Sequence, residues 1–425
     1  MAAFPSLVLV PANVPSLLLL LLLLTNSLLN SNAAATLTCP VGIFSFGDSL
    51  ADTGNYAAAF PDPPAPSTSS SSSSAIQVLS PQSSRVHNFF NYLDIRAAYD
   101  GAKLDMEFES SKAATKLPFR ASNGRLVIDF IAQAFRAPFL APYFQNVLPD
   151  YTNGVNFAFS SSTARNTSIS VPFYLYRQVN HYIYLKGNIY NAQGGASLPP
   201  FSIFSTALHW ISIGINDFYQ NYMVNNLSVS DVKNKVVPDA VHAVSEAVQR
   251  LYGFGARTFM VMNIPAVGCL PAFLSKFGTA NPGDYDSLGC LKNHNDAAKA
   301  YASQLRVALS NLRLTLPQAF IMYGDYYQVH LDAVTNPTQY GLHPNGTLTA
   351  CCGGGGKYNV PVSPCISSTP VCEDPQAYIS WDGLHFCESF NRAVALTFLH
   401  GDYVEPWPNS NLTAACSLDF SKFYS

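Results

Sequence analysis

Charged side chains are scarce in this chain. Of its 425 residues only 12% are Asp, Glu, Lys or Arg, against roughly 25% in average soluble domains. The 23 Lys and Arg against 26 Asp and Glu give a net charge of −3, and no block of basic residues occurs. Because nucleic acids and anionic membrane surfaces are bound through such blocks, the sequence predicts neither as a partner.

Long apolar runs are also missing, except at the N-terminus. Residues 17–24 are eight consecutive leucines, and small residues follow at 33–35. This pattern is typical of a secretory signal peptide, so we expect residues 1–35 to be removed. An uncleaved anchor is the alternative, because no Lys or Arg precedes the leucines, although prolines interrupt the longer apolar stretch. No later segment is long enough to span a bilayer, so we expect no stable membrane span in the mature chain.

Paired C-x-x-C motifs, which are typical of zinc sites, are absent although the chain has nine cysteines. Disulfides in an oxidising compartment are the better interpretation, and the odd number leaves at least one thiol unpaired. We expect no metal and no cofactor. Four N-x-S/T sequons are glycosylation acceptors in a secreted chain, at Asn166, Asn226, Asn345 and Asn411. Together with the leader, they predict a secreted protein of the extracellular space or cell wall.

Short apolar runs alternate with longer amphipathic segments, which predicts a parallel sheet with helices on both faces. The runs are at 41–46, 155–159, 208–213, 258–262 and 319–323, and helices are expected at 126–135, 232–252 and 293–314. Residues 61–74, PDPPAPSTSSSSSS, cannot pack a core, and residues 75–118 show no clear periodicity. We therefore predict one domain, residues 36–425, with an insertion at 61–118.

The most informative motif is FSFGDSLADTGN at 44–55. Its apolar run breaks at Gly47 and Asp48 and leaves Ser49 at a turn, and residues 50–60 can begin a helix. Backbone N–H groups at a helix start favour developing negative charge, so the turn can present a nucleophile as the G-x-S-x-G motif does. Asp52, Thr53 and Asn55 are expected to stabilise the turn and the helix start rather than to do chemistry.

A serine hydroxyl needs a base before it can attack a carbonyl. Asp382 and His385 lie three residues apart on a turn that contains glycine, close enough for a carboxylate to orient an imidazole. A solvated aspartate beside a turn-capping histidine is the alternative for an isolated D-x-x-H motif. The sequence therefore offers Ser49, His385 and Asp382 as a nucleophile, a general base and its orienting carboxylate.

Several ordered motifs resemble those of plant-type GDSL esterase/lipases, in the SGNH hydrolase superfamily. They are FGDSLADTGN at 46–55, SNGRLVIDFIA at 122–132, NGVNFAFSSST at 153–163, GIND at 214–217 and SWDGLH at 380–385. The resemblance implies a three-layer α/β/α, flavodoxin-like fold with a mainly parallel five-stranded sheet. It also implies Ser49, Asp382 and His385 as the catalytic residues of a serine esterase.

The same resemblance implies an oxyanion hole made by the N–H of Ser49, the side-chain amide of Asn216 and the N–H of a glycine. Ser161 stands where that glycine is expected. If the position needs a positive φ, a Cβ there costs roughly 1 kcal/mol or more and could turn the N–H away. Adaptation of the serine and a reduced rate both remain open. Cys387, two residues after the histidine, is a second departure from the family pattern.

These observations predict a secreted serine esterase or lipase that hydrolyses carboxylic esters through an acyl-enzyme. Its partner is then a small-molecule or lipid ester, or an acylated cell-wall polysaccharide. The alternatives are a polysaccharide O-acetyl esterase or acyltransferase, and a catalytically impaired relative that binds carbohydrate or lipid. The sequence predicts no particular acyl chain, disulfide pairing or oligomeric state.

Overall fold

The computed structural model describes residues 35–60, 119–145, 149–167, 171–192, 195–361, 365 and 369–425. Residues 1–34 of the expected leader and the whole expected insertion at 61–118 lie outside the described residues. The boundaries of the signal peptide and of the insertion therefore stay predictions.

A single sheet forms the centre of the molecule, with the strand order β2-β1-β3-β4-β5-β6. The strands are β1 (Ile43–Gly47), β2 (Gly154–Asn156), β3 (Leu208–Ser212), β4 (Thr258–Met262), β5 (Phe320–Gly324) and β6 (Val404–Glu405). The first five are parallel, and β6 pairs antiparallel with β5 at the edge. The predicted mainly parallel α/β sheet is confirmed, but within the described ranges it has six strands rather than five, because a two-residue strand leaves no pattern in the sequence.

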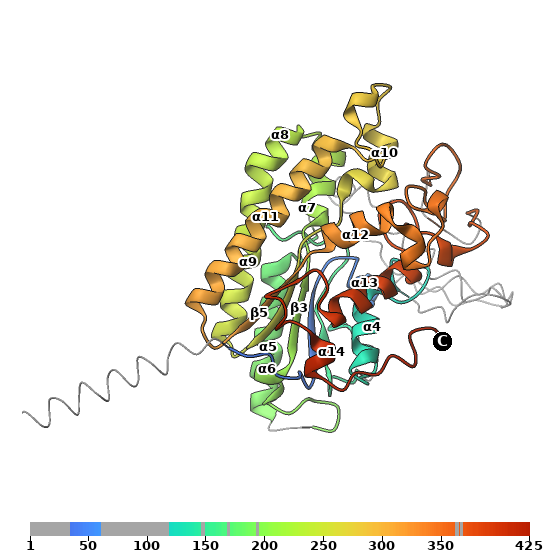
Figure 1. Cartoon of the computed structure of the whole chain (residues 1–425). Coiled ribbons are helices and arrows are strands. Elements are labelled where there is room, and N and C mark those ends of the chain that lie inside the picture. The colour runs from blue at the N-terminus through green and yellow to red at the C-terminus, as the bar shows by residue number, and fades with distance from the viewer. Residues whose placement is uncertain are drawn as a thin grey trace, which may run out of the picture.

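Helices cover both faces of this sheet (Figure 1). On one side lie α5 (Leu175–Ala192), α9 (Val237–Gly253) and α11 (Lys292–Thr315), and on the other lie α4 (Val127–Ala134) and α13 (Glu388–His400). The other α-helices of the described residues are α2 (Asn55–Ala59), α6 (Ile203–Thr206), α7 (Ile215–Tyr219), α8 (Val229–Asp231), α10 (Pro271–Phe277), α12 (Tyr326–Thr335) and α14 (Leu412–Ala415). The three helices expected from the sequence correspond to α4, α9 and α11. No helix within the described ranges is long and apolar enough to cross a membrane.

The strands form because their side chains are apolar and find helices on both sides. Every residue of the five parallel strands is buried. Phe44 of β1 stacks on Phe204 of α6 with 5.2 Å between ring centroids, and it makes a T-shaped contact with Tyr182 of α5 at 5.1 Å. Such aromatic contacts add to the free energy of burial and fix how α5 lies on the sheet.

The turn that carries Ser49 differs from the sequence prediction. The helix expected directly after Ser49 begins only at Asn55, and residues 48–54 form turns. The reason is the carboxylate of Asp52, whose Oδ1 accepts hydrogen bonds from the N–H groups of Gly54 at 2.8 Å and Asn55 at 2.6 Å. This side chain satisfies the free N–H groups at the start of α2, so the helix begins there and not beside Ser49.

Four disulfides are present, Cys39–Cys416, Cys269–Cys290, Cys351–Cys372 and Cys352–Cys365. The expectation of disulfides and of one unpaired thiol is confirmed, since Cys387 is free and buried. The adjacent Cys351 and Cys352 directly precede the glycine-rich segment at 353–356 and are bonded to Cys372 and Cys365.

Candidate active site

Three side chains from distant parts of the sequence form one hydrogen-bonded chain. Ser49 Oγ lies 2.9 Å from His385 Nε2, and His385 Nδ1 lies 2.6 Å from Asp382 Oδ2. The other carboxylate oxygen, Oδ1, accepts hydrogen bonds from the N–H groups of Leu384 and His385 at 3.0 and 2.8 Å. The structure thus brings together the three residues that the sequence offered as nucleophile, base and orienting carboxylate.

The turn from Asp382 to His385 is held by its neighbours. Gly383 has a φ of 99°, which an L side chain rarely adopts, and a Cβ there would lie 3.2 Å from a methyl of Val360. Its carbonyl oxygen accepts a hydrogen bond from the N–H of Ala272 at 3.0 Å. The backbone conformation of this turn therefore favours glycine, and a side chain at this position would also press against Val360.

The electrostatics of Asp382 and His385 favour an ion pair between them once the imidazole accepts a proton. Burial lowers the pKa of His385, but the charge and hydrogen bond of Asp382 together with the charge of Asp48 outweigh it, so the net pKa is raised. Burial raises the pKa of Asp382, but the charge and hydrogen bonds of His385 outweigh it and hold the net pKa below its usual value. Both shifts have the sign expected of a carboxylate that stabilises an imidazolium.

The strand end before Ser49 is fixed by a residue that sequence analysis missed. The side chain of Gln178, on α5, accepts a hydrogen bond from the N–H of Gly47 at 2.8 Å and donates one to its carbonyl oxygen at 2.7 Å. A Cβ at Gly47 would lie 2.2 Å from the carbonyl oxygen of Ser212, so only glycine lets β1 end there. Nothing in the sequence pattern marks Gln178, because the contact joins positions 131 residues apart.

Asp52 links the Ser49 turn to the loop after β2. Besides capping α2, its Oδ2 accepts a hydrogen bond from the N–H of Ser160 at 2.8 Å. The side chain of Asn55 donates to the carbonyl oxygens of Asn156 and Ala158, both at 2.8 Å. These contacts agree with a stabilising role for Asp52 and Asn55.

The loops after β2 and β3 bring Ser161 and Asn216 to the same end of the sheet as Ser49. Asn216 donates one hydrogen bond from Nδ2 to the carbonyl oxygen of Ser162 at 3.0 Å. The next residue, Asp217, is fully buried and accepts a hydrogen bond from the N–H of Ala164 at 2.7 Å. Asn216 and Asp217 therefore tie the two loops together.

Ser161 has a φ of 65° and lies in the left-handed region. The conformation that favours glycine is thus kept by a serine, at a cost of about 1 to 2 kcal/mol. The residue is only 7% exposed, and its carbonyl oxygen accepts a hydrogen bond from Gln220 Nε2 at 3.3 Å. The Cβ of Ser161 has therefore not moved the backbone out of the left-handed region.

Asp48 is a buried acid that the sequence did not single out. Burial raises the pKa of Asp48 to about 7, although the N–H of Leu50 and the charge of His385 lower it. Its Oδ1 accepts that N–H at 3.1 Å, while Oδ2 has no hydrogen-bond partner among the described residues. A carboxyl beside the nucleophile therefore changes its charge near neutral pH.

Comparison with known proteins gives the same assignment along the chain. Residues 43–398 match the model of a family described as GDSL-like lipase/acylhydrolase. The chain belongs to this family. It is 33% identical over 386 residues to a GDSL esterase/lipase of Arabidopsis thaliana, covering 86% of this chain and 88% of the relative. It is 30% identical over 395 residues to the sinapine esterase of Brassica napus, covering 89% and 90% of the two chains.

Membership of the GDSL family makes the chain a carboxylic ester hydrolase with the SGNH α/β fold. The matched region contains Ser49, Asn216, Asp382 and His385. No cluster of three or more His, Cys, Asp or Glu side chains suited to a metal ion occurs in the part of the chain that the structure describes.

Proposed function

We propose that this GDSL hydrolase cleaves its ester in two steps through an acyl-enzyme on Ser49. The observation that carries this proposal is the chain Ser49 Oγ–His385 Nε2–Asp382, with distances of 2.9 and 2.6 Å. His385 takes the proton of the hydroxyl as Ser49 attacks the carbonyl carbon, then gives it to the departing alcohol. Water activated by the same imidazole then releases the acid and regenerates the hydroxyl.

The negative charge of each tetrahedral intermediate needs hydrogen-bond donors. We assign three, the N–H of Ser49, the N–H of Ser161 and the side-chain amide of Asn216. Two observations support this assignment. Neither N–H has a hydrogen-bond partner among the residues with a described placement, and the bond from Asn216 to Ser162 uses one of the two Nδ2 hydrogens.

Secretion and glycosylation are part of the proposal. Four disulfides fit an oxidising compartment. The side chains of Asn166, Asn226 and Asn345 are exposed, as acceptors of glycans must be. Asn411 is half-buried, and its Oδ1 caps α14 by accepting the N–H of Ala414 at 2.8 Å.

Hydrolysis of a panel of p-nitrophenyl acyl esters tests the mechanism. Wild-type protein should release a rapid burst of p-nitrophenol followed by slower turnover, and Ser49→Ala should abolish both. Ser310→Ala, on the exposed side of α11, is the control for loss of a hydroxyl. Equal rates for Ser49→Ala and wild type across the panel would remove Ser49 as the nucleophile. Adding an alcohol acceptor and searching for a new ester separates acyl transfer from hydrolysis.

A further inference from the structure

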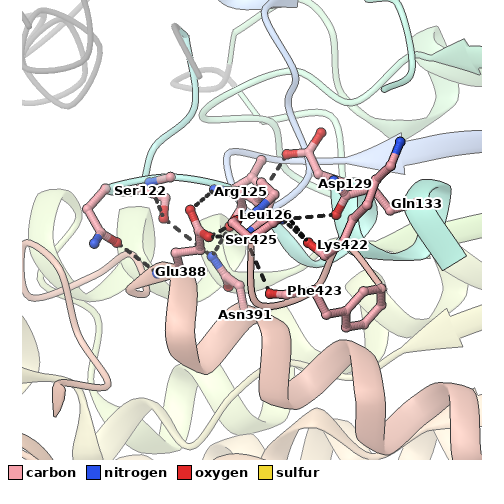
Figure 2. A network of polar contacts seen from close by, with 12 residues as sticks. Ser122, Arg125, Leu126, Asp129, Gln133, Glu388, Asn391, Lys422, Phe423 and Ser425 are labelled. Carbon is pink, nitrogen blue, oxygen red and sulfur yellow. Dashed lines mark hydrogen bonds and ion pairs between the residues drawn. The ribbon is translucent and has the colours of Figure 1, made fainter. Parts of the chain in front are cut away.

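A clamp of three residues, Ser122, Asn123 and Arg125, holds the chain directly after His385. Ser122 Oγ donates a hydrogen bond to the carbonyl oxygen of Phe386 at 2.9 Å. Asn123 Oδ1 accepts one from the N–H of Glu388 at 2.7 Å. Figure 2 shows Ser122 and Arg125 facing the first turn of α13. Nothing in the chemistry proposed above uses these residues.

Asn123 supplies a helix cap from another part of the chain. Helix α13 begins at Glu388, and the preceding Cys387 makes no capping hydrogen bond with its side chain. The first N–H groups of a helix need acceptors from outside it. Asn123 provides one for Glu388, so the start of α13, three residues after His385, depends on a contact 265 positions away in the sequence.

Arg125 makes the strongest contact of the clamp. Glu388 Oε1 accepts hydrogen bonds from Arg125 Nε at 2.9 Å and Nη2 at 2.6 Å, and Oε2 accepts the backbone N–H of Arg125 at 2.9 Å. The two side chains are only 3% and 1% exposed. Removing one partner of a buried ion pair leaves an uncompensated charge, so this contact strongly resists separation.

Gly124 allows the close approach. A Cβ on Gly124 would lie 1.7 Å from Glu388 Oε2, so it would displace the carboxylate from its present position beside Arg125. In this segment, Ser122 and Asn123 therefore hold the backbone at residues 386–388. Arg125 holds the Glu388 carboxylate, and Gly124 leaves room for that carboxylate.

The last residues of this sequence complete the surroundings of Arg125. Arg125 Nη1 donates to the carbonyl oxygen of Lys422 at 2.7 Å, and Nη2 donates to an oxygen of Ser425 at 3.0 Å. The ring of Phe423 is buried against Phe130 of α4, with 5.1 Å between centroids. Figure 2 shows this segment beside Arg125, across the guanidinium from Glu388.

From these contacts we propose that Asn123 and Arg125 are positioning residues for His385, and that residues 422–425 support them. The inference rests on the proposed function, because it assumes that His385 is the base. To act as the base, the imidazole of His385 must stay within hydrogen-bond distance of Ser49 Oγ, now 2.9 Å away. The turn from Asp382 to His385 that carries it is short. Anchoring the backbone at Phe386 and Glu388 limits how far the imidazole can move from that hydroxyl.

Asn123→Ala is the sharpest test, since it removes one hydrogen bond and leaves the ion pair in place. With a p-nitrophenyl ester, we expect kcat to fall about 10- to 100-fold with KM unchanged, the loss typical of a displacement near 1 Å. Combined with His385→Ala, the same substitution should cause no further loss, because the group that it positions is gone. If Asn123 had only a structural role, Asn123→Ala would lower kcat by the same factor in the wild-type protein and in the His385→Ala variant.

Arg136→Ala is the matched control, because Arg136 pairs at 3.7 Å with Asp419 near the same terminal residues but makes no described contact with α13. It should keep the wild-type kcat. Arg125→Lys keeps the charge but loses part of the guanidinium contacts, and it should reproduce the kcat loss of Asn123→Ala. If Arg125→Lys fails to fold, Asn123→Ala still decides the matter.

A folded Asn123→Ala protein with wild-type kcat would overturn the inference. It would also be overturned if Asn123→Ala lowered kcat by the same factor in the His385→Ala variant as in the wild-type protein. The proposed function fails by a different result, an active Ser49→Ala variant. The two failures are therefore distinguishable.

Discussion

Replacing Asp48 by asparagine removes a buried acid that lies next to the nucleophile in the sequence. Asp48 is 1% exposed, and burial raises its pKa to about 7 from an ordinary 3.8. The folded protein thus holds this proton more tightly than the unfolded chain does. The stabilisation from the bound proton is complete below pH 3.8, and it is lost as the pH rises through about 7.

The size of the effect follows from the two pKa values. One pKa unit corresponds to about 1.36 kcal/mol, so a shift from 3.8 to about 7 makes ionised Asp48 cost about 4 kcal/mol. About 3 kcal/mol of this cost develops between pH 5 and pH 8. Asparagine carries no charge at either pH, so the stability of Asp48→Asn relative to wild type should rise by this amount over the same interval.

Thermal unfolding of both proteins at pH 5 and pH 8 measures the difference. For a chain of this size, about 3 kcal/mol corresponds to a change in relative Tm on the order of 3 °C. Any packing defect of the asparagine is independent of pH and cancels in this comparison. Asp296→Asn, on the exposed side of α11, controls for loss of a carboxylate. A relative Tm that is equal at the two pH values would refute the account of Asp48.

The same substitution has a second effect, on the imidazole. Because the charge of Asp48 helps to raise the pKa of His385, Asp48→Asn should lower that pKa. A general base works when it is unprotonated, so the acid limb of the kcat/KM profile should move to lower pH. A limb that stays in place or moves to higher pH would contradict the electrostatic coupling between Asp48 and His385.

Three further substitutions address the oxyanion donors and the disulfides. Asn216→Ala should lower kcat about 100- to 1000-fold with little change in KM, measured on a p-nitrophenyl ester, and a smaller loss would remove its amide from the hole. Ser161→Gly should leave kcat within about threefold of wild type, because the serine already has a φ of 65°, whereas a gain above 100-fold would mean that its N–H points away. Replacing both Cys269 and Cys290 by alanine should cost about 3 kcal/mol in urea unfolding, given their separation of 21 residues, and an unchanged midpoint would contradict this.

The sequence predicted the five parallel strands because each is a short apolar run with helices on both sides. It did not predict β6, whose two residues have no period, or α5. The buried stripe of α5 includes Leu175, Val179, Tyr182 and Leu185, which is helical spacing, but its low mean hydropathy hides it. These elements are recognisable only when the surface that they cover is known.

The hydrogen-bonded chain at the site was predictable for a chemical reason. A serine at a strand end needs a base, and the sequence offers one D-x-x-H motif within a block that resembles its family. The raised pKa of Asp48, the bonds from Gln178 and the cap from Asn123 were not predictable. They arise from burial or from contacts between segments more than 100 positions apart, and no local pattern encodes them.

The two departures from the family pattern are accommodated in different ways, and this difference bears on whether the enzyme is impaired. Ser161 keeps the left-handed backbone conformation that favours glycine, so the strain is local to this residue. The side chain of Cys387 makes no capping hydrogen bond to α13, and Asn123 on another segment supplies an acceptor instead. Strain at Ser161 can lower stability without altering the site, whereas loss of the Asn123 contact acts on the loop that carries His385. Loss of contacts in the clamp at residues 122–125 should therefore lower the rate of ester hydrolysis more than the presence of a serine at position 161 does.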